Sequence, residues 1–100
     1  MRSYVAAHAE ALRARGFASL ALFGSLARGE AGPESDVDVL YAFAPGRSSL
    51  AAVLDVQEAL ASVTGRAVQM VSRRHLHPLL RDRILGEAES LLGIAAPASG

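Results

Sequence analysis

The chain has 100 residues, enough for one domain with a modest hydrophobic core. Ten basic and ten acidic residues give a formal net charge of zero, which argues against unspecific binding of nucleic acid. The absence of cysteine excludes a disulfide framework and a thiolate metal site. No charge-free apolar run reaches the roughly 18 residues of a membrane span, and the N-terminus lacks the pattern of a signal peptide. A cytoplasmic protein that does not contact a membrane is therefore expected.

Apolar periodicity between turn-forming residues predicts one domain with the element order α-β-α-β-α-β-α. The elements are expected, in this order, over residues 4–15, 17–23, 25–29, 37–43, from 49 or 50 to about 64, 66–72 and 78–92. The link between the first two strands is too short for a long crossover, so these strands are expected to be antiparallel and the sheet to be mixed. The fold class is thus α/β (α+β), with the domain over residues 1–94 and a frayed tail over 95–100.

Helix ends and buried faces follow from the same pattern. Ser3 is expected to cap the first helix, and Ser48 or Ser49 the long central helix, which Gly65 ends. Pro78 suits the first turn of the last helix. Helical spacing predicts two buried stripes, formed by Leu50, Val53, Leu54, Leu60 and Ala61 in the central helix and by Leu80, Ile84, Ala88 and Leu91 in the last.

Two short motifs within residues 22–41 contain the residues that are candidates for binding phosphate and metal. Gly24 and Ser25 follow the first strand at a strand-to-helix turn, where free backbone N–H groups attract phosphate. Asp36 and Asp38 are spaced i, i+2 in an extended segment, so their carboxylates are expected on one face, with Cα atoms about 7 Å apart. A divalent cation would relieve the repulsion between them. Each motif alone is weak evidence for a binding site, but the two motifs together with Arg28 predict a metal–nucleotide site.

The sequence Gly-Ser-Leu-Ala-Arg-Gly at 24–29, followed by Ser-Asp-Val-Asp-Val-Leu at 35–40, resembles the signature of the minimal nucleotidyltransferases of the DNA polymerase β superfamily. The likeness covers nearly the whole chain in length and element order. It implies a nucleotidyltransferase fold with a three-stranded mixed sheet flanked by helices. It also implies that ATP is the substrate and that the nucleotide is bound by Gly24, Ser25, Arg28 and Ser35.

By the same resemblance, Asp36 and Asp38 would bind Mg²⁺ in a two-metal site for in-line displacement at the α-phosphate. Members of this family often pair with a HEPN-domain ribonuclease in a toxin–antitoxin module. Some of them move AMP from ATP onto a tyrosine of the toxin. The resemblance therefore implies an antitoxin that transfers AMP to a protein hydroxyl, with a HEPN ribonuclease as its partner.

One position departs from the family pattern. The family places a third carboxylate in the third strand, where it holds the catalytic metal and accepts the proton of the attacking hydroxyl, and Gln69 takes that place here. An amide keeps one acceptor oxygen but loses the charge and the basicity. The second metal would then be poorly held, and the loss of a general base costs a factor of about 10²–10⁴ in rate. Asp55 and Glu58 could compensate only from the central helix, where their spacing favours its solvated face.

Three functions follow from these residues. The first is an Mg²⁺-dependent enzyme that transfers AMP to a protein, and the second is a degenerate antitoxin that acts by binding its partner directly. The third, nucleotidylation of an aminoglycoside antibiotic, is disfavoured because the chain is too short to add the domain that embraces such a substrate. Gln69 favours the second function over the first.

The remaining features of the sequence concern surfaces that could contact a partner. The apolar surplus favours an interface on the third or last helix, with the partner or in a homo-oligomer. Four arginines, which could contact an acidic partner or a nucleic acid, have acids nearby in sequence and are expected on a solvated face: Arg73, Arg74, Arg81 and Arg83. Direct binding of nucleic acid is not expected.

Overall fold

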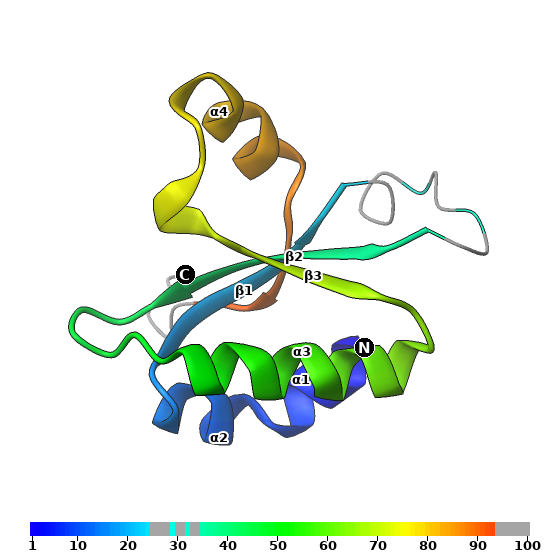
Figure 1. Cartoon of the computed structure of the whole chain (residues 1–100), viewed down its shortest axis with the longest axis vertical. Coiled ribbons are helices and arrows are strands. Elements are labelled where there is room, and N and C mark those ends of the chain that lie inside the picture. Colours follow the sequence, from blue (N-terminus) through cyan, green and yellow to red (C-terminus); the bar gives the residue numbers. More distant parts are fainter. Residues whose placement is uncertain (25–28, 30–31, 33–34, 94–100) are drawn as a thin grey trace.

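The computed structural model describes residues 1–24, 29, 32 and 35–93. Its elements are α1 (Arg2–Ala7), α2 (Ala9–Ala14), β1 (Phe17–Phe23), β2 (Val37–Phe43), α3 (Leu50–Thr64), β3 (Val68–Ser72), the 3-10 turn η1 (Arg73–His75), α4 (Pro78–Glu87) and β4 (Glu89–Leu92). Helices α1 to α3 cover one face of the sheet, and α4 stands on its other side (Figure 1). The mixed α/β architecture is the predicted one.

The sheet has four strands in the order β3-β2-β1-β4. Strand β1 pairs antiparallel with β2 and with β4, whereas β2 pairs parallel with β3. The prediction of a mixed sheet with an antiparallel first pair is therefore confirmed. The parallel pair is joined by α3, which supplies the long crossover that parallel neighbours need. The expectation of three strands was one strand short.

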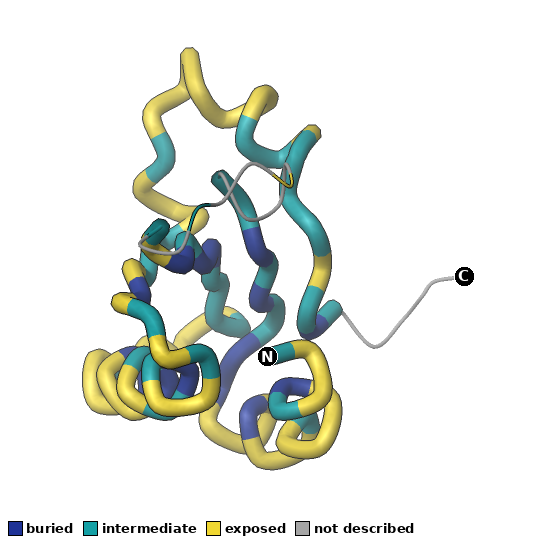
Figure 2. Tube along the Cα trace, turned by 90° about the vertical axis from the view of Figure 1, so that its right-hand side faces the viewer, coloured by how far each residue is buried: buried dark blue, intermediate teal, exposed yellow. Residues whose placement is uncertain are grey.

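The core lies between the sheet and helices α1 to α3. Val37 and Val39 of β2 are fully buried there, and Val5 of α1 and Leu60 of α3 belong to the same cluster. Buried residues gather on this side of the sheet, whereas α4 has none (Figure 2). Because side chains alternate along a strand, Asp38 of β2 faces away from this core.

Helix α3 begins and ends where the sequence predicts. The Ser49 hydroxyl accepts a hydrogen bond from the amide of Ala52 at 3.2 Å, and Gly65 ends the helix in a left-handed conformation with φ of 68°. The predicted stripe is wrong in part, because Leu50 and Leu54 are 73% and 52% exposed. The sheet instead covers the helix face formed by Ala52, Val53, Val56 and Leu60.

The C-terminal helix predicted over 78–92 is wrong over residues 88–92. Helix α4 ends at Glu87, since Ala88 takes an extended conformation with ψ of 141°. The next residues form β4, in which Ser90 pairs with Ala21 and Leu92 with Leu20 of β1. Pairing with the open edge of β1 overrides the helical periodicity, and it buries Leu92 to 3% exposure. No described residue of α4 is buried, although the sequence predicted an inward stripe there.

The first helix is divided into two at His8, where φ is −109° and ψ is 14°. The helical region starts at Arg2, so Ser3 lies inside α1 and does not cap it. The expected helix over 25–29 and the expected tail over 95–100 lie outside the described residues. Within the described part, no helix is both long enough and apolar enough to cross a membrane.

Candidate nucleotide and metal site

Gly24, directly after β1, lies against the carboxylate of Asp38. Phe23 and Asp38 are direct partners in the β1–β2 ladder, so Gly24 leaves the sheet beside the acid. A Cβ atom at Gly24 would overlap Oδ2 of Asp38 and would lie 3.3 Å from its Cγ. Gly24 also has φ of 77°, a conformation that side chains rarely adopt. Both the backbone angle and the neighbouring acid therefore require glycine here.

Asp36 and Asp38 lie at the start of β2. Asp36 directly precedes the strand and is exposed, whereas Asp38 lies within it and is half-buried. The amide of Val37 between them donates to the carbonyl oxygen of Ala67 at 2.8 Å, which extends the pairing with the chain before β3. In an extended chain, residues two apart lie on the same side. The two carboxylates therefore share the sheet face that is opposite the core.

Gln69 is the direct partner of Asp38 in the parallel β2–β3 ladder. Gln69 is exposed. Its assignment to the position of the family's third carboxylate stays a prediction. Phe23, Asp38 and Gln69 thus follow one another across three adjacent strands, and Gly24 comes directly after Phe23. Among the described residues, no three His, Cys, Asp or Glu side chains come close enough to hold a metal ion. The strand face offers two carboxylates and one amide oxygen.

This donor set fits Mg²⁺, which proteins usually bind through one or two carboxylates together with the phosphates of the substrate. Asp55 and Glu58 do not complete the set, because α3 packs against the core face of the sheet. Both residues are exposed, and Asp55 accepts a hydrogen bond from Arg15 at 2.9 Å. The prediction that they belong to the solvated face of the helix is confirmed.

Ser35 has a defined local role. Its hydroxyl accepts a hydrogen bond from the amide of Gly32 at 2.9 Å, and its own amide donates to the Gly32 carbonyl at 3.2 Å. These two bonds close the turn that leads into Asp36. Contact of Ser35 with a nucleotide stays a prediction, as do the roles of Ser25 and Arg28, which lie outside the described residues.

Sequence reasoning missed Arg66. Its guanidinium donates to the carbonyl oxygens of Gly32 and Ser35 at 2.8 and 2.9 Å. Arg66 thereby ties the turn before Asp36 to the start of β3. A single arginine after Gly65 gives no signal for this role, because its partners are more than thirty residues earlier in the chain.

A glycine directly after the first strand, an acid pair on the adjacent strand and a mixed sheet agree with the nucleotidyltransferase fold. The family model for the nucleotidyltransferase domain matches residues 5–91. The chain therefore belongs to the nucleotidyltransferase domain family, as the resemblance of its motifs predicted.

Two relatives carry names that describe an activity. A candidate protein adenylyltransferase of Methanocaldococcus jannaschii is 44% identical over 71 residues, which cover 71% of this chain and 75% of that protein. The protein adenylyltransferase MntA of Thermococcus cleftensis is 34% identical over 88 residues, which cover 87% of this chain and 88% of that protein.

A solved structure shows the same fold at lower identity. It is the complex of a tri-AMPylated HEPN toxin of Shewanella oneidensis with its MNT antitoxin. The match has a TM-score of 0.59 and 21% identity, and it covers 93% of this chain and 73% of the matched chain.

Proposed function

We propose that the chain binds ATP with Mg²⁺ and transfers AMP to a hydroxyl group of a partner protein. The observation that carries this proposal is the packing of the Asp38 carboxylate against Gly24, which brings an acid to a turn suited to phosphate. The names of the two relatives support AMP as the transferred group and a protein as the acceptor.

In this function, the backbone at Gly24 binds the terminal phosphates, with Ser25, Arg28 and Ser35 as further predicted contacts. Asp36 and Asp38 would hold Mg²⁺, which when bound neutralises charge on the phosphates. The acceptor oxygen forms a bond to the α-phosphorus while the bond from that phosphorus to the pyrophosphate oxygen breaks. Gln69 is too weakly basic to take the hydroxyl proton, which therefore passes to water.

The proposed partner is a HEPN-domain ribonuclease, and the proposed role is that of its antitoxin. The solved complex of a HEPN toxin with an MNT antitoxin supports this partner class through the shared fold. Its toxin carries AMP groups, which agrees with a protein hydroxyl as the acceptor.

A second candidate function rests on Gln69. Because Gln69 stands directly opposite Asp38, the site has two negative charges where the family pattern has three. The chain would then keep a nucleotide pocket and neutralise its partner by direct binding, with weak transfer or none. The loss of the general base alone would lower the rate by a factor of about 10²–10⁴.

Transfer of labelled AMP to the co-purified partner separates the two functions. The unmodified chain, Asp36→Ala and Gln69→Asp are each incubated with ATP and Mg²⁺, and label on the partner is measured. Glu58→Ala is the matched control, since it removes an exposed carboxylate from α3, away from the site. Binding of ATP with Mg²⁺ is measured on the same samples by calorimetry.

Strong labelling by the unmodified chain that disappears in Asp36→Ala and persists in Glu58→Ala would establish the enzyme. Labelling by Gln69→Asp alone, with nucleotide binding in both proteins, would support the binding antitoxin. The nucleotide-site proposal is wrong if ATP with Mg²⁺ gives no binding heat with the unmodified chain.

A further inference from the structure

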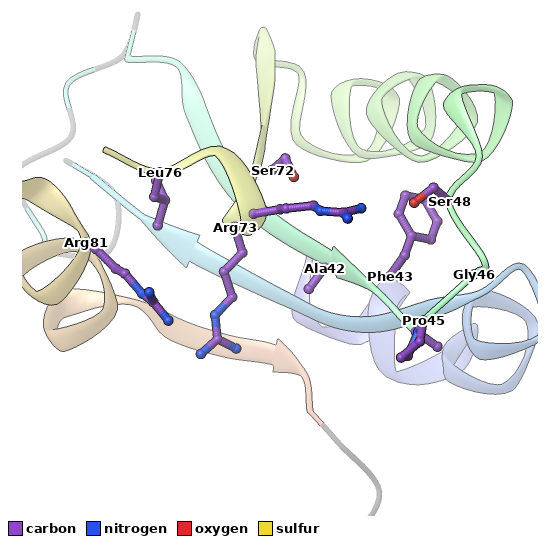
Figure 3. A pocket seen from close by; sticks show the side chains of 11 residues that line it. Ala42, Phe43, Pro45, Gly46, Ser48, Ser72, Arg73, Leu76 and Arg81 are labelled. Carbon is purple, nitrogen blue, oxygen red and sulfur yellow. The ribbon is translucent and has the colours of Figure 1, made fainter. Parts of the chain in front are cut away.

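A cavity of about 570 Å³ opens at the ends of β2 and β3 that are remote from Gly24. Three guanidinium groups and three apolar side chains contribute to its lining: Arg73, Arg74 and Arg81, and Phe43, Pro45 and Leu76. Figure 3 shows Arg73 and Arg81 coming from η1 and α4, while Phe43 and Pro45 come from β2 and the loop after it. Elements that are distant in sequence thus build this space, the arginine cavity.

Three arginines give the lining of the arginine cavity a positive charge. None of its described lining residues is acidic, and its three arginines are exposed. In the described part of the chain, ion pairs join Arg2 with Glu89 and Arg15 with Asp55, but none involves these three arginines. The three arginines are exposed, as the sequence predicted, and the fold in addition gathers them around one space. Their mutual repulsion is relieved by an anionic ligand.

The apolar side chains of the lining restrict which class of ligand can bind in the cavity. Phe43 and Leu76 offer contact to carbon atoms, which an inorganic anion cannot use. A neutral nucleobase would not need three cations. Nucleic acid is disfavoured because its backbone needs a long basic track, whereas the whole chain has a net charge of zero. An acidic peptide segment supplies both carboxylates for the guanidinium groups and carbon atoms for the apolar side chains.

The cavity lies at the end of the sheet and reaches the face that carries the acid pair, although Phe43 in its lining packs toward the core. Asp38 and Ala42 of β2 are an even number of residues apart, and Ala42 lines the cavity. Four residues of strand span about 13 Å. A peptide held at the arginines can therefore extend along this face and bring a hydroxyl group four or so residues further on to the acids.

We propose that the arginine cavity docks an acidic segment of the partner protein, next to the hydroxyl that receives AMP. The docking of an acidic peptide is a property of the cavity alone. That the docked segment belongs to the protein that accepts AMP rests on the proposed function.

The test uses a fluorescent nine-residue peptide with four glutamates around one tyrosine, and the matched peptide with glutamines. Binding is followed by anisotropy, without nucleotide, in about 50 mM NaCl. The unmodified chain is expected to bind the glutamate peptide and to bind the glutamine peptide at least about tenfold more weakly. Arg73→Ala and Arg81→Ala are each expected to raise the Kd by about tenfold. Arg83→Ala, which removes an exposed arginine of α4 that is not part of the lining, is expected to leave the Kd within about twofold.

The docking proposal is overturned if the unmodified chain does not bind the glutamate peptide at millimolar concentration, or if Arg83→Ala weakens binding as much as Arg81→Ala. It is also overturned if a ten-nucleotide uridine oligomer binds more tightly than the peptide and depends on the same arginines. Because no nucleotide is present, peptide binding can persist when AMP transfer fails, and that result would overturn only the proposed function.

Discussion

The carboxylate of Asp38 packs against the backbone of Gly24, so the acid and the turn that follows the neighbouring strand form a single feature of the surface. The turn is set by φ of 77° at Gly24, and the acid by its place in β2 opposite Phe23. A side chain cannot be added at residue 24 without moving the Asp38 carboxylate. This coupling makes Gly24 the position at which the nucleotide site is most easily tested.

We expect Gly24→Ala to damage both stability and nucleotide binding. The methyl group would overlap the Asp38 carboxylate, and the positive φ adds strain of about 1–2 kcal/mol. Titration with ATP and Mg²⁺ should show a Kd at least about tenfold higher, which corresponds to about 1.4 kcal/mol. Gly65→Ala is the matched control, because Gly65 has φ of 68° but no neighbouring atom within 4 Å. An equal loss of nucleotide binding in both variants would mean that backbone strain alone is responsible.

Gln69→Asp should make stability depend on metal. A third carboxylate next to Asp38 adds repulsion, so the Tm without metal should fall by a few degrees, as about 1 kcal/mol would produce in a chain of this size. Addition of Mg²⁺ should reverse the fall, because a cation that binds only the folded state stabilises it. Thermal unfolding with EDTA and with Mg²⁺ measures both effects. Gln69→Asn should neither lower the Tm without metal nor make the Tm depend on Mg²⁺. If the Tm of Gln69→Asp does not rise when Mg²⁺ is added, residue 69 lies outside the metal site.

Arg66→Ala should loosen the turn that precedes Asp36. The change removes two hydrogen bonds from a charged donor to the Gly32 and Ser35 carbonyls, and should lower the free energy of unfolding by about 1–3 kcal/mol. Nucleotide affinity should fall as well, since Asp36 follows the turn directly. Arg66→Lys should be intermediate, because an ammonium group lacks the planar fork that bridges two acceptors. Unfolding in urea and calorimetry with ATP and Mg²⁺ check the two effects, and unchanged affinity in Arg66→Ala would remove Arg66 from the support of the site.

Leu92→Ala tests the fourth strand. Leu92 is 3% exposed in β4 and opposite Leu20, so its truncation should cost about 2–4 kcal/mol of stability. Leu79→Ala is the matched control on α4, where the side chain is 85% exposed, and should change stability by less than about 0.5 kcal/mol. Urea unfolding measures both. Similar costs at the two positions would contradict the pairing of β4 with β1.

Local signals in the sequence were sufficient for several elements. The strands over 17–23 and 37–43 are largely apolar runs between turn residues, and both were predicted with their observed bounds. The central helix was predicted with Ser48 or Ser49 as its cap and Gly65 as its end, because a capping hydroxyl and a left-handed glycine act within one turn of the helix, and the structure has Ser49 as the cap. The acid pair and the glycine turn were also visible, since each motif lies in a few consecutive residues.

Contacts between distant segments decided the rest. Residues 89–92 have helical periodicity, but the open edge of β1 offers hydrogen bonds that make them a strand. Leu50 and Leu54 fit an apolar stripe, yet the sheet covers another face of α3. Strand register and chain crossing decide three further features. They place Gln69 opposite Asp38, they bring Arg66 to the carbonyl groups before Asp36, and they gather the cavity arginines. The sequence by itself determined the local elements and the chemistry of the motifs. Only the tertiary structure decided which of them meet, because those contacts join residues whose separation along the chain carries no local pattern.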